Sequence, residues 1–494
     1  MLYYTRFSFI GQVRCGLFKG EFMKKTQILS LFLAILMLMS FSLVGEALEK
    51  DDNVALGSHS LHAAVPLAGS EQLLDTAQAV VAYELNTDTL LYTWNADQRL
   101  NPTGMVKLLT ALIVLEQGNL DDIVTVYRST LDTIVWGAVS AGLKAGEEVP
   151  LRDLLLCVMV ASANDAAAVM AVHIAGSQER FVEMMNEKAL QLGCTNSNFT
   201  NVHGLFDEAQ YSTARDLAVI VEAALENETF FEMFSRDNFS MAATNLSGSR
   251  YFITTNYMMS DEYMNQYFDY RVTGGKPAAA TSMDRSMICT AEVGNSRYLF
   301  VVMSTQSPVS EDGLSVLSFE NFIETRKLMN YAFNGYTVRQ IADRDQVFYQ
   351  YAVNNGQNDV VLGVADDVRV LLPAGYDKDA VVYQNVVDAA KLKAPIAQGD
   401  VLGYLQISYD GLILAKCDLV AMNFVTEKGS VLEDAERIPI KQEVVDDSWK
   451  DLLIWGGVGL ACVVLLILVS IKLVQNLRIR RMQGYRMRKR RRSR

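Results

Sequence analysis

Residues 102–111 read Pro102-Thr103-Gly104-Met105-Val106-Lys107-Leu108-Leu109-Thr110-Ala111, and Lys107 is the single charge at the head of an apolar run that continues to Leu115. This run predicts a long apolar helix over 105–115. A lysine in apolar surroundings has a lowered pKa and can then act as a general base. A lysine at a helix end can also extend its ammonium into solvent while its stem packs on apolar surface. Taken alone, residues 102–111 favour this second interpretation.

A polar segment, Ser162-Ala163-Asn164-Asp165, separates two further apolar helices predicted over 151–160 and 165–174. A hydroxyl and an amide two residues apart can face one cleft, where they can relay protons and orient an amide substrate. By itself this segment is too common to indicate a site.

A third segment reads Val272-Thr273-Gly274-Gly275-Lys276-Pro277-Ala278. Its small residues would allow the backbone to approach a ligand closely. Alone, the segment is typical of a turn with a solvated lysine.

Taken together, these segments resemble in order and spacing the S-x-x-K, S-x-N and K-T-G motifs of penicillin-binding enzymes. Residues 201–205 (Asn-Val-His-Gly-Leu) and 211–218 (Tyr-Ser-Thr-Ala-Arg-Asp-Leu-Ala) resemble a segment typical of the D-alanyl-D-alanine carboxypeptidase family of serine peptidases. Residues 394–403 resemble the C-terminal β-domain of that family. The resemblance covers about residues 75–421, and it implies a β-lactamase-like, DD-peptidase (transpeptidase-like) fold.

The resemblance also implies an activity and roles for particular residues. Members of the family remove the terminal D-alanine from the peptidoglycan stem peptide. Their serine attacks the carbonyl, the lysine of the first motif takes its proton, and backbone N–H groups hold the oxyanion. By this resemblance Lys107, Ser162 and Asn164 are the catalytic candidates. Lys276 would help to bind the substrate carboxylate.

The sequence departs from the family pattern at two places in the expected site. Gly104 stands where the nucleophilic serine is expected, and Pro277 and Ala278 replace the threonine and glycine of the third motif. (An alternative register takes Val272-Thr273-Gly274 as the third motif and loses the lysine instead.) Loss of a catalytic serine costs on the order of 10⁶ in rate. We therefore expect a catalytically inactive homologue whose cleft survives as a binding site for peptidoglycan stem peptides or envelope proteins.

The rival hypothesis is a working D-Ala-D-Ala carboxypeptidase that uses another nucleophile. Thr103 lies four residues before Lys107 and shares a helical face with it. Its hydroxyl would point roughly 100° away from the direction of the missing serine. Thr103 is therefore predicted to be a helix N-cap. Water activated by Lys107 is the second route to activity.

The part of the chain between residues 48 and 451 divides into two predicted folded units and two linkers. Strands on both sides of a turn at 86–88, a strand at 297–304 and a closing helix at 319–333 accompany the apolar helices, so residues 73–337 predict an α+β domain. Short β-branched runs such as 360–364 and 368–372 alternate with turns, so residues 338–425 predict a small all-β domain. Residues 48–72 and 426–451 are interpreted as linkers.

Both ends of the chain predict contact with a membrane. Residues 1–47 contain a basic stretch, an apolar stretch and a small-x-small exit, as a secretory signal peptide does. Residues 452–471 form a run of 20 residues without charge, long enough for a transmembrane helix. Residues 472–494 carry eleven basic residues and no acidic one, which places this tail in the cytoplasm. We expect a single-pass cell-membrane protein with an extracytoplasmic body.

Charge and cysteine content exclude several classes of partner. The net charge is −13, while the tail contributes +11 and residues 1–47 contribute +3, so residues 48–471 carry −27. Such an acidic body repels nucleic acid. The six cysteines have no paired spacing, and of the four histidines only His59 and His62 lie close together. We expect no disulfide framework, no metal site and no cofactor.

The predicted topology can be tested with an epitope fused after Arg494. Protease added to cells with an exposed surface should digest the body and spare the epitope, because the basic tail is expected in the cytoplasm. Immunoblotting against the epitope measures the protected fragment. Loss of the epitope while the membrane remains sealed would show that the predicted orientation is wrong.

Overall fold

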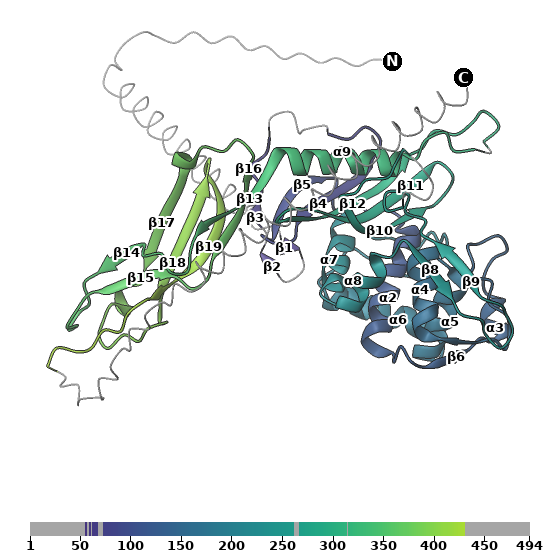
Figure 1. The fold of residues 1–494 in the computed structure, drawn as a ribbon, viewed down its shortest axis with the longest axis horizontal. Coiled ribbons are helices and arrows are strands. Elements are labelled where there is room, and N and C mark those ends of the chain that lie inside the picture. Colours follow the sequence, from purple (N-terminus) through teal and green to yellow (C-terminus); the bar gives the residue numbers. More distant parts are fainter. Residues whose placement is uncertain are drawn as a thin grey trace, which may run out of the picture. The chain divides into compact units, whose positions relative to one another are not determined.

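The computed structural model describes residues 55–56, 59–60, 62–67, 73–260, 266–313 and 315–429 (Figure 1). The predicted signal peptide at 1–47, transmembrane helix at 452–471 and basic tail at 472–494 lie outside these residues, as does nearly all of the second linker. Within the described ranges, no helix has the length and apolar character needed to cross a membrane.

A six-stranded sheet with the strand order β10-β11-β12-β4-β5-β3 forms the centre of the first domain. Neighbouring strands are antiparallel except β3 and β5, which are parallel. The predicted strands beside the turn at 86–88 and the strand at 297–304 are confirmed. The bounds are β3 His62–Ala63, β4 Ala79–Glu84, β5 Thr89–Trp94, β10 Val272–Ala279, β11 Asp284–Val293 and β12 Ser296–Gln306.

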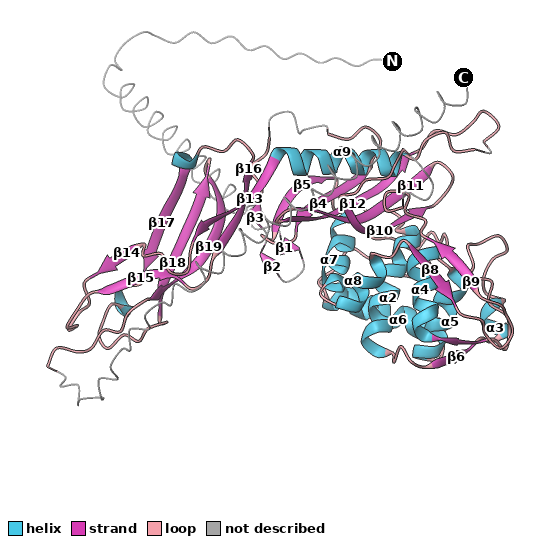
Figure 2. Ribbon diagram, in the orientation of Figure 1, coloured by secondary structure: helices cyan, strands magenta, loops and turns pink. Residues whose placement is uncertain are grey.

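Both faces of this sheet are covered, so β4 is buried along its whole length. Successive strand residues point to opposite faces. Val81 and Tyr83 accordingly belong to the core under a helical cluster, whereas Val80 and Ala82 belong to the core under α9 (Glu320–Gly335). Figure 2 shows α9 along one face of the sheet and the other helices on the opposite face.

The helical cluster is built around α2, which is buried from Val106 to Val114 because other helices surround it. The helices predicted over 105–115, 151–160, 165–174 and 319–333 are confirmed. The cluster contains α2 Val106–Gln117, α3 Arg128–Leu131, α4 Leu151–Ala161, α5 Asn164–Ala175, α6 Gln178–Gln191, α7 Ala214–Leu225 and α8 Glu228–Phe234. Two small antiparallel ladders accompany it, β6 Ile123–Thr125 with β7 Glu148–Pro150 and β8 Asn238–Met241 with β9 Arg250–Ile253.

The segment predicted as an unpatterned linker at 48–72 contains ordered pairings, so this prediction was wrong for part of its length. β1 (Ala55–Leu56) pairs with β2 (His59–Ser60), and β3 pairs with β5 at the edge of the central sheet. Ala64 and Val65 are buried. Two-residue strands pair through backbone groups and need no apolar periodicity, so they leave no pattern in the sequence.

The predicted all-β character of the second domain is confirmed among the described residues. Its first strand begins at Tyr336, directly after α9, rather than at Val338. One sheet pairs β13 Tyr336–Ala342 with β16 Val368–Pro373, and the other has the order β14-β15-β19-β18-β17. They enclose a separate core that includes Leu362, Leu405 and Leu419. The remaining strands are β14 Tyr349–Tyr351, β15 Val360–Val364, β17 Val381–Val387, β18 Val401–Tyr409 and β19 Leu412–Ala421, with 3₁₀ turns at Lys378–Ala380 and Ala389–Lys391.

The long loop that follows α3 is held in place by the carboxylate of Asp165, at the start of α5. This carboxylate accepts hydrogen bonds from Ser140 Oγ at 2.6 Å, from the Ala141 N–H at 2.8 Å and from the Leu143 N–H at 3.1 Å. The loop therefore has a defined path although it belongs to no helix or strand.

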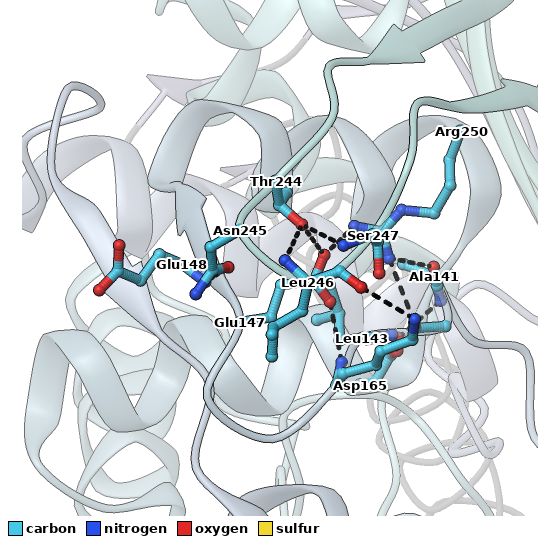
Figure 3. A network of polar contacts seen from close by, with 12 residues as sticks. Ala141, Leu143, Glu147, Glu148, Asp165, Thr244, Asn245, Leu246, Ser247 and Arg250 are labelled. Atoms are coloured by element: carbon cyan, nitrogen blue, oxygen red, sulfur yellow. Dashed lines mark hydrogen bonds and ion pairs between the residues drawn. The ribbon is translucent and has the colours of Figure 1, made fainter.

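A second buried carboxylate, that of Glu147, fixes the far end of the same loop (Figure 3). It accepts hydrogen bonds from Thr244 Oγ1 at 2.7 Å and from the Lys144 N–H at 2.9 Å, and it pairs with Arg250. Arg250 also donates to the Ala141 carbonyl at 3.1 Å. Burial alone would raise the pKa of Glu147, but these hydrogen bonds and the Arg250 charge lower it below its ordinary value.

Glu147→Gln is expected to lower the free energy of unfolding by about 1–3 kcal/mol at neutral pH, because the amide cannot pair with Arg250 as an ion. The folded-state pKa of Glu147 is lowered, so its contribution exists above the unfolded-state pKa and is lost as the pH falls through the folded value. The difference in the free energy of unfolding between wild type and variant should therefore shrink below about pH 4. Urea unfolding at several pH values measures it.

The matched control is Glu183→Gln, which removes an exposed ion pair with Arg180 at 2.6 Å. It should change stability much less than Glu147→Gln does, because exposed ion pairs contribute little to folding. Equal effects of the two substitutions, or a gap that widens on acidification, would contradict the role given to Glu147.

Candidate active site

The residues that precede α2 do not form the N-cap that was predicted for Thr103. A 3₁₀ turn, Thr103–Met105, precedes α2, and its N-cap is Pro102 rather than Thr103. The Thr103 hydroxyl is buried and has no hydrogen-bond partner among the described residues. The predicted N-cap role of Thr103 is therefore wrong. The physical reason is local crowding, since a Cβ on Gly204 would lie 1.8 Å from the Thr103 carbonyl oxygen, and Thr103 adopts a φ of 49°.

Gly104 lies where the three sequence segments meet. An ideal Cβ built on it would lie 3.7 Å from Lys107 Nζ, 3.7 Å from Ser162 Oγ and 3.5 Å from Ala278 Cβ. These are ordinary van der Waals separations, so the backbone at this position would accept a side chain. The fold thus brings one residue of each segment around the position at which the family pattern has its serine.

Lys107 is buried, with 2% of its surface exposed, and its Nζ donates a hydrogen bond to the carbonyl oxygen of His203. Burial lowers the pKa of Lys107 to about 7. The amine is consequently neutral in a large fraction of molecules at neutral pH, as a general base must be. The structure therefore excludes the alternative in which Lys107 extends into solvent.

His203 belongs to the segment that packs against the start of α2. Burial, together with the charge of Lys107, lowers the pKa of His203 to about 4. Its Nδ1 accepts a hydrogen bond from the Leu205 N–H at 3.2 Å. His203 is therefore neutral at physiological pH. Its backbone carbonyl anchors Lys107, a role that the sequence resemblance did not assign.

Ser162 and Asn164 occupy the break between α4 and α5. Ser162 ends α4 in the left-handed conformation, with φ 60° and ψ 30°, and it lines the cavity described below. The side-chain and backbone N–H groups of Asn164 both donate to the Val139 carbonyl at 2.8 Å. Asn164 thereby ties the loop fixed by Asp165 to the rim of the site.

Lys276 lies on β10, the edge strand of the central sheet. Its Nζ donates to the carbonyls of Val158 at 2.8 Å and Met159 at 3.3 Å, near the end of α4. Burial, and then the charge of Lys107, lower the pKa of Lys276 well below its ordinary value. Lys276 is not among the described residues that line the cavity.

Pro277 and Ala278 follow Lys276 on β10 and do line the cavity. Val272, Thr273 and Gly274, the alternative register of the third motif, do not contribute to the lining among the described residues. Thr273 Oγ1 instead donates to Thr290 Oγ1 at 2.9 Å. The geometry therefore favours the register in which the lysine is kept and the threonine is replaced by Pro277.

These residues surround a cavity of about 470 Å³. Its described lining contains no aspartate or glutamate, whereas Lys107 and Arg285 contribute cationic groups. Sequence reasoning missed Arg285, as well as the aromatic side chains of the lining, because no local pattern marks them. No group of three potential metal ligands occurs within the described ranges. The lining consists of Gly104, Lys107, Gly137, Ala138, Val139, Ser162, Asn164, His203, Gly204, Leu205, Thr255, Tyr257, Pro277, Ala278, Ala279, Arg285, Phe319 and Phe322.

Comparison with known proteins gives consistent matches across both domains. Residues 68–307 match the D-alanyl-D-alanine carboxypeptidase family, and residues 336–427 match the C-terminal domain of penicillin-binding protein 5. The chain is 27% identical over 366 residues to D-alanyl-D-alanine carboxypeptidase DacF of Bacillus subtilis, which covers 73% of this chain and 89% of that protein. It is 30% identical over 270 residues to a D-alanyl-D-alanine carboxypeptidase of a Streptomyces species, covering 52% of this chain and 88% of that protein.

A solved structure gives the same result. Penicillin-binding protein 5 from Haemophilus influenzae superimposes with a TM-score of 0.57 at 28% identity, covering 71% of this chain and 98% of that chain. The matches to both domains, the shared fold and the meeting of the three segments at Gly104 show that this chain belongs to the D-alanyl-D-alanine carboxypeptidase family of penicillin-binding proteins.

Proposed function

We propose that this protein is a catalytically inactive member of its family that binds peptidoglycan stem peptides, or envelope proteins, in the cleft beside Gly104. One observation carries the proposal: the groups around the nucleophile position are in place, but Gly104 supplies no nucleophile. In this proposal the predicted signal peptide at 1–47 exports the body, and the transmembrane helix predicted at 452–471 anchors it in the cell membrane.

Two properties of the cavity support binding without hydrolysis. Its volume of about 470 Å³ suits a short peptide, because ligand pockets commonly measure about 300–1,000 Å³. Its described lining carries cationic groups and no carboxylate, which favours an anionic ligand such as the C-terminus of a stem peptide. Covalent catalysis, by contrast, needs an atom that attacks the carbonyl.

Thr103 is poorly placed to supply that atom. Its hydroxyl is buried without a hydrogen-bond partner among the described residues, and Thr103 does not belong to the described lining of the cavity. The route through activated water has better support, because burial lowers the pKa of Lys107 to about 7 beside the space left at Gly104. A slow hydrolase is therefore the second candidate function, and release of D-alanine from a stem-peptide analogue would establish it.

Purified ectodomain, about residues 48–450, should form no covalent adduct with a β-lactam, because no hydroxyl lies at the position of Gly104. Intact-mass spectrometry after incubation with penicillin measures the adduct. A mass increase of one acyl group that disappears in Thr103→Ala would overturn the proposal, since it would identify Thr103 as a working nucleophile.

Gly104→Ser combined with Pro277→Thr and Ala278→Gly should restore penicillin labelling. The serine would place its Oγ near Lys107 Nζ, and Ala278→Gly removes the Cβ that lies 3.5 Å from the new Cβ. Gly104→Ser alone should restore little labelling, because Pro277 lacks the hydroxyl that docks the carboxylate of the penicillin. The two strand changes alone should restore none, because only the serine supplies the bond-forming atom. Fluorescent penicillin on a denaturing gel measures the labelling.

Circular dichroism and thermal melting provide the control for folding in this series. A correctly folded triple variant that remains unlabelled would show that the cleft has diverged beyond these three side chains. It would also make a surviving substrate site untenable.

A further inference from the structure

The β10 side of the cavity has lost its means of holding a carboxylate. Pro277 has neither a hydroxyl nor a backbone N–H, and Ala278 presents only a methyl group. Lys276 already donates to the carbonyls of Val158 and Met159 at 2.8 and 3.3 Å. The cavity-lining side chains of Pro277 and Ala278 therefore offer an anionic ligand no hydrogen-bond donor.

The neighbouring strand supplies a different cation. Arg285 on β11 lies directly opposite Ala279 on β10 in the antiparallel register. Side chains of directly opposed residues lie on the same face of a sheet. Both residues accordingly line the cavity, and the small side chain of Ala279 leaves space beside the arginine.

The guanidinium of Arg285 is oriented by two contacts. Its Nε donates to the Ser282 carbonyl at 3.1 Å, and the group lies over the ring of Phe319, 4.6 Å from the ring centre. Phe319 is itself packed against Tyr257, with ring centres 5.4 Å apart. An arginine held in this way loses little further freedom when it binds a ligand.

The two terminal nitrogens of Arg285 remain available. Among the described residues, Arg285 donates one hydrogen bond, from Nε, and stacks on Phe319, and no described carboxylate forms an ion pair with its terminal nitrogens. Burial lowers the pKa of Arg285 and the nearby Tyr257 phenol offsets only part of this, but a guanidinium stays protonated at physiological pH. Lys107, the other cation of the lining, is partly neutral at pH 7 and is bonded to the His203 carbonyl.

We propose that Arg285 binds the C-terminal carboxylate of the peptide held in this cavity, in place of the third-motif residues lost at Pro277 and Ala278. The two terminal nitrogens of a guanidinium match the two oxygens of a carboxylate. This inference rests on the proposed function, and it assigns the specificity for a free C-terminus to a residue outside the three motifs.

The test compares an N-acylated L-lysyl-D-alanyl-D-alanine peptide with its C-terminal carboxamide, using the full-length protein in detergent. Ligand-observed NMR measures both dissociation constants, and mass spectrometry confirms that the peptides stay intact. Wild type should bind the acid at least about 10-fold more tightly than the amide, since a hydrogen-bonded charge is lost in the amide. Arg285→Gln should bind the two peptides equally, and Arg285→Lys should keep a reduced preference.

Arg180→Gln is the matched control, because Arg180 is exposed and lies on α6, outside the cavity lining. It should behave as wild type, and circular dichroism should show all variants folded. If wild type prefers the acid but Arg285→Gln keeps this preference, or if wild type binds both peptides equally, the role of Arg285 is wrong while peptide binding stands. If wild type binds neither peptide, binding of stem peptides fails and the inference fails with it.

Discussion

The burial of the Lys107 ammonium near the start of α2 is the constraint around which the site is built. A buried amine requires hydrogen-bond acceptors, and here the acceptor is the backbone carbonyl of His203. This contact holds the 203–205 segment against the 3₁₀ turn that contains Gly104. Lys276 on β10 is held in the same way, because its amine donates hydrogen bonds to the carbonyls of Val158 and Met159 near the end of α4. One buried amine thus ties the first segment to residues 203–205, and the other ties the third segment to the end of α4, next to the second segment.

This arrangement separates the shape of the cleft from its chemistry. Neither buried lysine depends on a side chain at position 104, because both bind backbone atoms. An ideal Cβ at Gly104 would make only ordinary contacts, so the exchange of serine for glycine at this position requires no rearrangement. The fold can therefore keep a cleft whose nucleophile is missing. Its described lining carries cationic groups and no carboxylate, and the proposed binding of an anionic ligand rests on this property.

Much of this protein was predictable from sequence because long apolar runs specify helices and strands almost by themselves. The runs at 105–115 and 151–160 are confirmed as α2 and α4. The short β-branched runs that alternate with turns after residue 338 are confirmed as β structure. The predictions that failed concern short segments. Thr103 is not an N-cap, because the chain at this point is shaped by its close approach to Gly204. Residues 62–63 pair with β5 although their sequence shows no alternation.

By itself, the sequence determined the two domain types, the family resemblance and the absence of a nucleophile at Gly104, because these depend on the order and identity of residues along the chain. Only the tertiary structure decided the state of Lys107, since its pKa depends on burial by residues distant in sequence. The same holds for Lys276, which is turned toward α4, and for Arg285, which reaches the cavity through the register of β10 and β11. Burial and cross-strand register arise between segments that lie far apart in the chain, so no local pattern records them.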